Sequence, residues 1–442
     1  MEIQMTIPFF RKAGRTALLA SAMAMLASTA GAQQSAPAAP ALDTGNTAWV
    51  LVSTALVLMM TIPGLALFYG GMVRKKNVLA TVMQSFAVCC LATVLWFVAG
   101  YSLAFSDGGG MNAYVGGLSK AFFAGITTST LWAPGVANIP EFVFAVFQMT
   151  FAVITPALIA GAFAERMKFS ALLLFTGLWL LVVYAPIAHW VWGGGFLGSA
   201  GVLDFAGGTV VHINAGVAGL VCALVLGKRE GYGSVNMAPY NLVYAVIGAS
   251  LLWVGWFGFN AGSELAADGL AGAAMVNTQV AAAAAGLAWM AVEWIVAKKP
   301  SVLGIISGAV AGLVAVTPAA GFVNPTGAFG IGIAAGIVCY LSAVKLKHTF
   351  GYDDSLDAFG VHGVGGIIGA LLTGLFADKT INSLGANASV ATQFYGIVFT
   401  VAWTALATAA ILYAVKATVG LRPSRQEEIE GLDITQHGEV VQ

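Results

Sequence analysis

The sequence predicts an all-α membrane protein with eleven transmembrane helices, built as two inverted repeats of five helices plus one extra helix. Three observations lead to this prediction. Hydrophobic residues make up 59% of the 442 positions and charged residues only 9%, whereas soluble domains carry roughly 25% charge. Apolar runs long enough to cross about 30 Å of hydrocarbon follow one another along the chain. The basic residues alternate between loops in a way that orients these runs.

The first 32 residues are predicted to be a signal peptide. Arg11, Lys12 and Arg15 precede an apolar run over residues 16–28, and Ala30-Gly31-Ala32 supplies small residues for cleavage. The run is too short to span the bilayer, and the alternative is an uncleaved anchor helix. Residues 33–46 then form an extracytoplasmic linker. This organisation indicates a bacterial inner membrane, with the mature N-terminus outside.

Residues 47–417 form the predicted transmembrane domain, and residues 418–442 form a cytoplasmic tail. The domain contains eleven apolar runs of spanning character. They lie near Ala48–Gly70, Val78–Phe105, Phe142–Ala164, Phe169–Ala188, Gly207–Leu226, Ala238–Phe259, Met275–Ala297, Val302–Thr317, Gly327–Leu346, Ala358–Phe376 and Ala391–Val415.

Lysine and arginine placement supports this topology, because short cytoplasmic loops collect these residues. Fourteen of the 19 fall in the tail or in the loops after predicted spans one, three, five, seven and nine: Arg74, Lys75, Lys76, Arg166, Lys168, Lys228, Arg229, Lys298, Lys299, Lys345, Lys347, Lys416, Arg422 and Arg425. The loops on the other side hold only Lys120 and Lys379. An even number of spans would destroy this partition.

Composition also argues against several classes of function. The formal net charge is zero, so nothing indicates a nucleic-acid partner. The four cysteines (Cys89, Cys90, Cys222 and Cys339) lie in apolar runs, so neither a disulfide nor a metal site is expected. We expect no cofactor. We also find no nucleophile with a base and no metal cluster, so an enzyme is not expected.

Two histidines lie deep in predicted spans, where ionisable side chains are costly and usually functional. Asp204 precedes His212 by eight residues and Asp357 precedes His362 by five. The two segments enter the membrane from opposite faces, which predicts an in-plane pseudo-two-fold relation with the site at its interface. Glycines flank both histidines and would allow the two helices to approach closely. The alternative is two core histidines, each satisfied by a local carbonyl.

The remaining histidines, His189, His348 and His437, are interpreted as interfacial or solvent-exposed. Aromatic residues gather near the outer ends of the spans. For Trp190 and Trp253 we expect membrane-interface anchoring and core packing. Aromatic faces can also stabilise a desolvated cation by up to about 2 kcal/mol.

At these residues the sequence resembles the Amt/Mep/Rh ammonium transporters, and among them the bacterial Amt proteins. The resemblance covers essentially the whole mature chain. Its most specific segments are Asp204-Phe205-Ala206-Gly207-Gly208-Thr209-Val210-Val211-His212-Ile213-Asn214, Trp256-Phe257-Gly258-Phe259-Asn260-Ala261-Gly262-Ser263 and Phe359-Gly360-Val361-His362-Gly363.

The resemblance implies a homotrimer with a pore through each subunit that conducts ammonium or ammonia across the bilayer. Phe151, Trp192 and Ser263 match an outer ammonium-binding site, which Asp204 supports from outside the path. Phe151 and Phe259 match a stacked pore gate, and His212 and His362 match the twin histidines of the pore. Gln148, Trp256 and Thr317 match supporting residues of the vestibule and upper pore.

The resemblance also implies a soluble partner, a trimeric PII-type regulatory protein that binds the cytoplasmic face. Two alternative functions are a neutral-gas channel of the Rh type, passing NH3 or CO2, and an ammonium sensor with secondary transport. Trp192 at the outer site favours ammonium over a neutral gas. A sensor would normally carry a long cytoplasmic domain, and only about 25 residues follow the last predicted span.

Overall fold

The computed structural model describes residues 41–442; the predicted signal peptide and residues 33–40 of the predicted linker lie outside the described residues. The α-helices are α2 (Thr44–Met59), α3 (Ala66–Met72), α4 (Val78–Leu95), α5 (Tyr101–Phe105), α6 (Glu141–Phe163), α7 (Phe169–Trp179), α8 (Ala185–Trp192), α9 (Phe196–Ser199), α10 (Asn214–Leu226), α11 (Leu242–Asn260), α12 (Gly269–Ala297), α13 (Val302–Val316), α14 (Pro325–Leu341), α15 (Lys347–Phe350), α16 (Val364–Phe376), α17 (Val390–Thr418) and α18 (Arg425–Glu430).

Within residues 41–442, ten helical segments are long and apolar enough to cross a membrane. They are Thr44–Met72, Lys75–Phe105, Glu141–Phe163, Phe169–Ser199, Gly208–Leu226, Leu242–Glu264, Gly269–Ala297, Pro325–Phe350, Phe359–Phe376 and Val390–Thr418. The predicted eighth span is present as α13, but its 15 residues extend only about 22 Å. This is less than the hydrocarbon thickness of about 30 Å. The predicted total of eleven spans is therefore not confirmed, because α13 is short by this measure.

π-helical turns occur within six of these segments, at Met60–Leu65, Trp96–Gly100, Leu180–Tyr184, Gly208–Ile213, Ser342–Leu346 and Phe359–Gly363. Such turns are rare in proteins overall, and those that occur are often found at functional sites. Two of them carry the histidines singled out above, His212 and His362.

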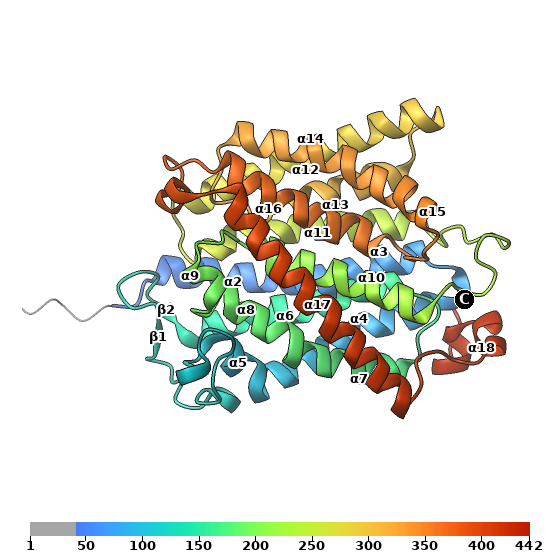
Figure 1. The fold of residues 1–442 in the computed structure, drawn as a ribbon, viewed down its shortest axis with the longest axis horizontal. Helices are drawn as coiled ribbons and strands as arrows, with labels where there is room; N and C mark the ends of the chain where they lie inside the picture. The colour runs from blue at the N-terminus through green and yellow to red at the C-terminus, as the bar shows by residue number, and fades with distance from the viewer. Residues whose placement is uncertain (1–40) are drawn as a thin grey trace, which may run out of the picture. The chain divides into compact units, whose positions relative to one another are not determined.

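The long helices run side by side across the view in Figure 1. A two-residue antiparallel pair, β1 (Leu131–Trp132) and β2 (Ile139–Pro140), lies at one end of the bundle, with Trp132 opposite Ile139. We call this end, which also carries α9, the hairpin end. The opposite end carries α15 and α18 and is called the tail end (Figure 1).

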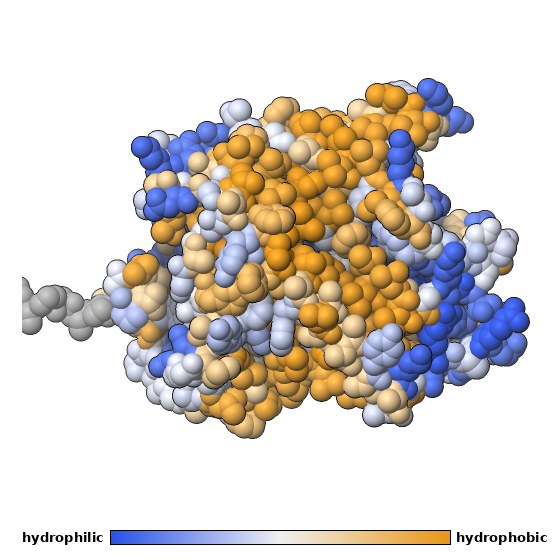
Figure 2. Space-filling model, in the orientation of Figure 1, coloured by the Kyte–Doolittle hydropathy of each residue, from blue (hydrophilic) through white to orange (hydrophobic). Residues whose placement is uncertain are grey.

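A broad hydrophobic band covers the middle of the molecule, and hydrophilic residues gather at its two ends (Figure 2). Large apolar side chains of the helices remain exposed, including Leu51 at 54%, Ile295 at 71% and Leu406 at 72%. Exposed apolar surface of this extent is not tolerated in water. It fits a protein embedded in a bilayer.

The tail packs back onto the bundle at the tail end. Ser424 and Glu427 form a capping box that begins α18. The Asp433 carboxylate then accepts hydrogen bonds from the backbone N–H groups of Leu79 (3.0 Å) and Ala80 (2.7 Å). Asp433 therefore caps the N-terminus of α4, where the helix dipole favours negative charge.

The three histidines outside the centre differ from one another. His189 is fully buried, and its ring nitrogens lie 2.9 and 2.7 Å from the carbonyl oxygens of Ala104 and Asn112. Its interpretation as interfacial is therefore wrong, because the ring connects α8 to α5 and to the segment after α5. His348 is exposed, and His437 is partly exposed with its ring against Phe169.

Candidate functional site

Two buried imidazoles meet at the centre of the bundle. The Nδ1 atoms of His212 and His362 lie 3.3 Å apart, and the rings are nearly parallel with centroids 5.4 Å apart. A neutral imidazole has one N–H donor and one acceptor nitrogen. One ring therefore donates through Nδ1 and the other accepts, which leaves one Nε2 as a donor and the other as an acceptor.

Close helix crossing brings the rings together, as their flanking glycines predict. A Cβ at Gly216, four residues after His212, would lie 2.1 Å from the Gly363 nitrogen. A Cβ at Gly366, four residues after His362, would lie 3.0 Å from the Ile213 nitrogen. Each helix therefore uses the residue four positions after its histidine to contact the residue directly after the other histidine, as a pseudo-two-fold relation requires.

Buried carboxylates cap both histidine segments. Asp204 accepts hydrogen bonds from four consecutive backbone N–H groups at 2.6–3.0 Å, those of Gly207, Gly208, Thr209 and Val210. Asp354 accepts two, from Ala358 (3.0 Å) and Phe359 (2.8 Å). Both caps satisfy backbone donors that a helix N-terminus leaves free inside the protein.

The counterpart of Asp204 is therefore Asp354 and not Asp357, which corrects the sequence-based pairing. Asp354 and Asp204 each precede their histidine by eight residues. Asp357 corresponds instead to Gly207, five residues before the other histidine, and both have positive φ, 58° and 116°. The Asp357 carboxylate pairs with Lys347. Burial, and secondarily the charge of Asp357, raises the pKa of Asp354 to about 6.

Aromatic rings cover the histidines on the side of the hairpin end. Phe151 and Phe259 stack with centroids 4.3 Å apart, and Phe259 lies 5.9 Å from the His212 ring. Trp256 stacks on His212 at 5.4 Å, and its Nε1–H donates to Thr317 Oγ1 at 2.8 Å. Both phenylalanines are essentially inaccessible, so this ring pair separates the histidines from the hairpin end.

Beyond the phenylalanine pair lies a cavity of about 180 Å³, the hairpin-end cavity. It is lined by Phe105, Trp132, Phe144, Gln148, Trp192, Phe205, Ser263 and Leu265. The Trp192 indole N–H donates to the Asp204 backbone carbonyl at 2.9 Å, which orients the ring. Ser263 Oγ donates to the Phe259 carbonyl at 2.8 Å and keeps its lone pairs to accept.

Two of the residues predicted for the outer site, Trp192 and Ser263, line the hairpin-end cavity. Gln148, which was predicted as a supporting residue of the vestibule, lines it with them. Phe151 does not line it; its ring lies beneath, 6.0 Å from that of Trp192. Asp204 does not line the cavity either, and contacts it only through its backbone carbonyl, which accepts from Trp192.

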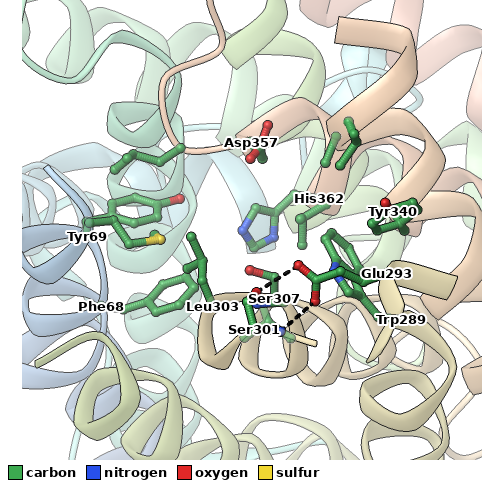
Figure 3. Close-up of a pocket in the computed structure, with 17 residues that line it drawn as sticks. Phe68, Tyr69, Trp289, Glu293, Ser301, Leu303, Ser307, Tyr340, Asp357 and His362 are labelled. Atoms are coloured by element: carbon green, nitrogen blue, oxygen red, sulfur yellow. Dashed lines mark hydrogen bonds between the residues drawn. The ribbon is translucent and has the colours of Figure 1, made fainter. Parts of the chain in front are cut away.

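On the other side of the histidines lies the tail-end cavity of about 170 Å³, with His362 in its wall (Figure 3). Tyr69, Trp289, Tyr340 and Ser307 are among its lining residues. Glu293 also lines it and accepts from Ser301 Oγ (2.8 Å) and the Ser301 N–H (3.0 Å) at the start of α13. The histidine pair therefore stands between two cavities.

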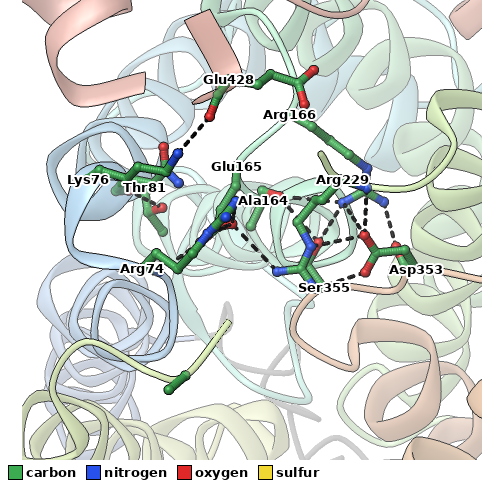
Figure 4. Close-up of polar contacts among 12 residues, drawn as sticks. Arg74, Lys76, Thr81, Ala164, Glu165, Arg166, Arg229, Asp353, Ser355 and Glu428 are labelled. Atoms are coloured by element: carbon green, nitrogen blue, oxygen red, sulfur yellow. Dashed lines mark hydrogen bonds and ion pairs between the residues drawn. The ribbon is translucent and has the colours of Figure 1, made fainter. Parts of the chain in front are cut away.

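Buried ion pairs join four loops at the tail end (Figure 4). This tail-end cluster comprises Arg74, Glu165, Arg166, Arg229 and Asp353. Glu165 accepts from the Arg74 N–H and Nε–H, both at 2.7 Å, and Asp353 accepts from Arg229 Nη2 at 2.8 Å. Burial acts to raise the pKa of Asp353, but hydrogen bonds and charge from Arg229 outweigh it and bring the pKa below its usual value.

Sequence reasoning missed several of these residues. Asp354 had a detectable signal, since its spacing from His362 repeats that of Asp204 from His212. Glu165 and Asp353 could have been suspected as counter-charges to nearby arginines. Trp132 had no signal, because it reaches the cavity from β1 between two spans.

Apolar helices of spanning length, with a buried histidine pair and a stacked phenylalanine pair between two cavities, define a multi-pass membrane protein. A family model described as the Ammonium Transporter Family matches residues 48–442, and the chain belongs to this family. It is 50% identical over 407 residues to an "Ammonium transporter" of Bacillus subtilis, covering 90% of this chain and 98% of that one. It is 51% identical over 408 residues to one of Aquifex aeolicus, covering 90% and 93%.

Solved structures agree with these relatives. Saccharomyces cerevisiae Mep2 matches with a TM-score of 0.81 at 37% identity, covering 87% of this chain and 89% of that one. A structure described as "Sensor Amt Protein" matches with a TM-score of 0.80 at 28% identity, covering 89% and 98%.

Proposed function

We propose that this protein takes up ammonium across a bacterial inner membrane. Ammonium is recruited in the hairpin-end cavity and loses a proton. The nitrogen then passes the Phe151–Phe259 pair and the twin histidines into the tail-end cavity. The observation that carries this proposal is the 3.3 Å contact between His212 and His362, which places hydrogen-bonding groups in an otherwise apolar constriction. Family membership supports the choice of ammonium.

Recruitment rests on Trp192 and Ser263. The indole face attracts a cation, by up to about 2 kcal/mol where water is excluded, and Ser263 Oγ accepts one N–H. Gln148 adds a buried Oε1 with no hydrogen-bond partner among the described residues. Sodium costs more to desolvate because it is smaller, and potassium has no N–H to donate to these acceptors.

Conduction rests on separating the proton from the nitrogen. A charge at the bilayer centre costs about 2.5 kcal/mol or more, whereas ammonia is neutral. The pair offers one Nε2 donor and one Nε2 acceptor, which together match the lone pair and the N–H groups of ammonia. A hydrogen-bonded pair can also relay a proton, and its titration belongs to both rings together.

The proposed orientation places the hairpin end outside the cell and the tail end in the cytoplasm. It follows the positive-inside rule, since Arg74, Arg166 and Arg229 lie at the tail end (Figure 4). Cleavage after residue 32 and assembly into a homotrimer with one pore per subunit belong to the same proposal. N-terminal sequencing of membrane-purified protein and its mass in native mass spectrometry test the two points.

A PII-type regulatory protein is the proposed cytoplasmic partner. The tail end offers a polar platform in which α18 and residues 433–437 pack against the loops beside the pore. Pull-down with the host's PII protein across ADP, ATP and 2-oxoglutarate conditions tests the idea. Absence of binding under all of these conditions would contradict it.

Flux measurements distinguish the proposed function from two alternatives, a gas channel and an ammonium sensor. An Rh-type gas channel would pass CO2 as readily as NH3. A sensor, the description carried by one structural relative, would bind ammonium with little flux. Ammonium-evoked current from purified protein in liposomes, with CO2 permeability measured alongside, tests the main proposal. Binding without current, or CO2 flux without ammonium selectivity, would replace it.

A further inference from the structure

A lysine ammonium group lies beside the hairpin-end cavity. Lys120 Nζ lies 5.8 Å from the ring centroid of Trp132, and Trp132 lines that cavity. The same Nζ lies 5.8 Å from the ring centroid of Tyr101. Aromatic faces and a primary ammonium group are the chemistry proposed for substrate recruitment, so the tethered cation resembles the solute.

A buried carboxylate neutralises this lysine. Lys120 pairs with Oε1 of Glu141, whose side chain is 4% exposed, against 29% for the lysine. Tyr101 donates its hydroxyl to the same oxygen at 2.7 Å. An unpaired charge at this depth would be costly, so each member of the pair depends on the other.

The pair is connected directly to the cavity wall. Glu141 begins α6, which carries Phe144, Gln148 and Phe151 on successive turns of the helix face that descends towards the gate. Trp132 stacks on Phe144 with centroids 3.7 Å apart and planes within 6°. A change of charge at the ion pair would therefore act across one layer of aromatic rings, where screening by water is weak.

We propose that the Lys120–Glu141 ion pair sets the charge at the hairpin-end cavity. Glu141 cancels the lysine so that its charge does not repel incoming monovalent cations. Lys120 occupies the carboxylate so that the cavity does not bind cations without selectivity. This inference rests on the proposed recruitment of ammonium in that cavity. It assigns both residues to positioning and specificity, and neither to the conduction path.

The two single substitutions have opposite expected effects. Glu141→Gln leaves an uncompensated ammonium beside the cavity, so the half-saturating ammonium concentration should rise about threefold to tenfold. Lys120→Met leaves the carboxylate, so this concentration should fall by a similar factor and potassium should begin to compete. The double variant restores neutrality and should return to within about twofold of wild type.

The experiment records ammonium-evoked currents at pH 7.5 from full-length protein in liposomes, over a range of ammonium concentrations with and without potassium. Low ionic strength enlarges the shifts, since the Debye length is about 30 Å at 0.01 M salt. Lys379→Ala is the matched control, because it removes one exposed positive charge from the loop after α16. Its half-saturation should stay at the wild-type value.

A purely structural role would move all three variants in the same direction, lowering maximal current or yield, and would overturn the proposal. A double variant no better than Glu141→Gln would also overturn it. If Glu141→Gln does not fold, Lys120→Met and the double variant still decide the sign. Lack of both ammonium-evoked current and ammonia flux in the wild type would instead refute the proposed function itself.

Discussion

His212 and His362 are 150 residues apart in the chain, yet their Nδ1 atoms lie 3.3 Å apart in the core. Both belong to π-helical turns capped by aspartates eight residues upstream. The two histidines thus occupy equivalent positions in the two inverted repeats, and the repeats meet at these positions.

Removing either ring should abolish conduction without preventing assembly. In His212→Ala or His362→Ala the remaining imidazole loses its partner, at a cost of about 1–3 kcal/mol, and the constriction loses its relay. Ammonium current in liposomes should collapse, while gel filtration still shows folded protein. His212→Asp should pass potassium alongside ammonium, because it places a fixed charge in the path. Wild-type current in the double alanine variant would contradict the relay.

Recruitment should be separable from conduction. Trp192→Leu removes the cation–π face, at about 0.5–2 kcal/mol, and Ser263→Ala removes an acceptor. We expect the half-saturating ammonium concentration to rise several-fold to tenfold or more, with maximal current less affected. Trp190→Leu is the control, because Trp190 lies on the same helix but outside the hairpin-end cavity. If the current at saturating ammonium falls as much as the current at low ammonium, Trp192 is part of a gate and not of a recruitment site.

Asp354 should give the protein a pH-dependent stability. Its folded-state pKa of about 6 exceeds an unfolded value of about 3.9, so the folded state holds the proton more tightly. The contribution is fully present below the unfolded pKa and is lost as the pH rises through 6. Between pH 5 and 7.5 this stabilising contribution should fall by on the order of 1 kcal/mol.

Thermal unfolding of purified protein tests this. The melting temperature of wild type relative to Asp354→Asn should be higher at pH 5 than at pH 7.5. Asp353→Asn is the matched control, because the pKa of Asp353 is lowered and the group stays ionised in both states over this range. If the difference in melting temperature between wild type and Asp354→Asn does not vary with pH, the Asp354 carboxyl does not titrate between pH 5 and 7.5.

The close contact between the helices at Gly216 and Gly363 should not tolerate one added methyl group. In Gly216→Ala the added carbon would meet the Gly363 nitrogen at 2.1 Å, so the two helices must separate. Overpacking typically costs about 1–3 kcal/mol, and separation would also part the imidazoles. We expect a lower melting temperature and reduced current. Gly177→Ala is the control, since its nearest neighbour is the end of Leu95 at 3.4 Å; normal current in Gly216→Ala would contradict the argument.

Much of the fold could be predicted because membrane insertion leaves a strong trace in composition. Ten of the eleven predicted spans are helices of sufficient length, as expected where every backbone group must bond internally. The eighth run was predicted at the right place, but the helix that it forms has only 15 residues. Hydropathy shows that a segment is apolar and does not show that a short helix crosses the whole bilayer.

The site was only partly predictable for a different reason. His212 and His362 stand out because ionisable residues are rare in spans. Asp354 was passed over in favour of Asp357, although its spacing from His362 repeats that of Asp204 from His212. The sequence does not show that Asp357 has positive φ and pairs with Lys347. Arg166 and Arg229 were interpreted as topology signals, whereas Arg166 is buried and Arg229 largely buried beside Asp353. Such pairings depend on tertiary contacts between loops.

The close approach of Gly216 to Gly363 sets the separation of the two imidazoles, because the helices leave no room there for even one methyl group. Main-chain atoms have no rotamers through which to adjust, so the backbone and not side-chain packing holds the two rings at their distance. In the proposed pathway, the solute is then selected by how well its hydrogen bonds fit a geometry that the backbone fixes.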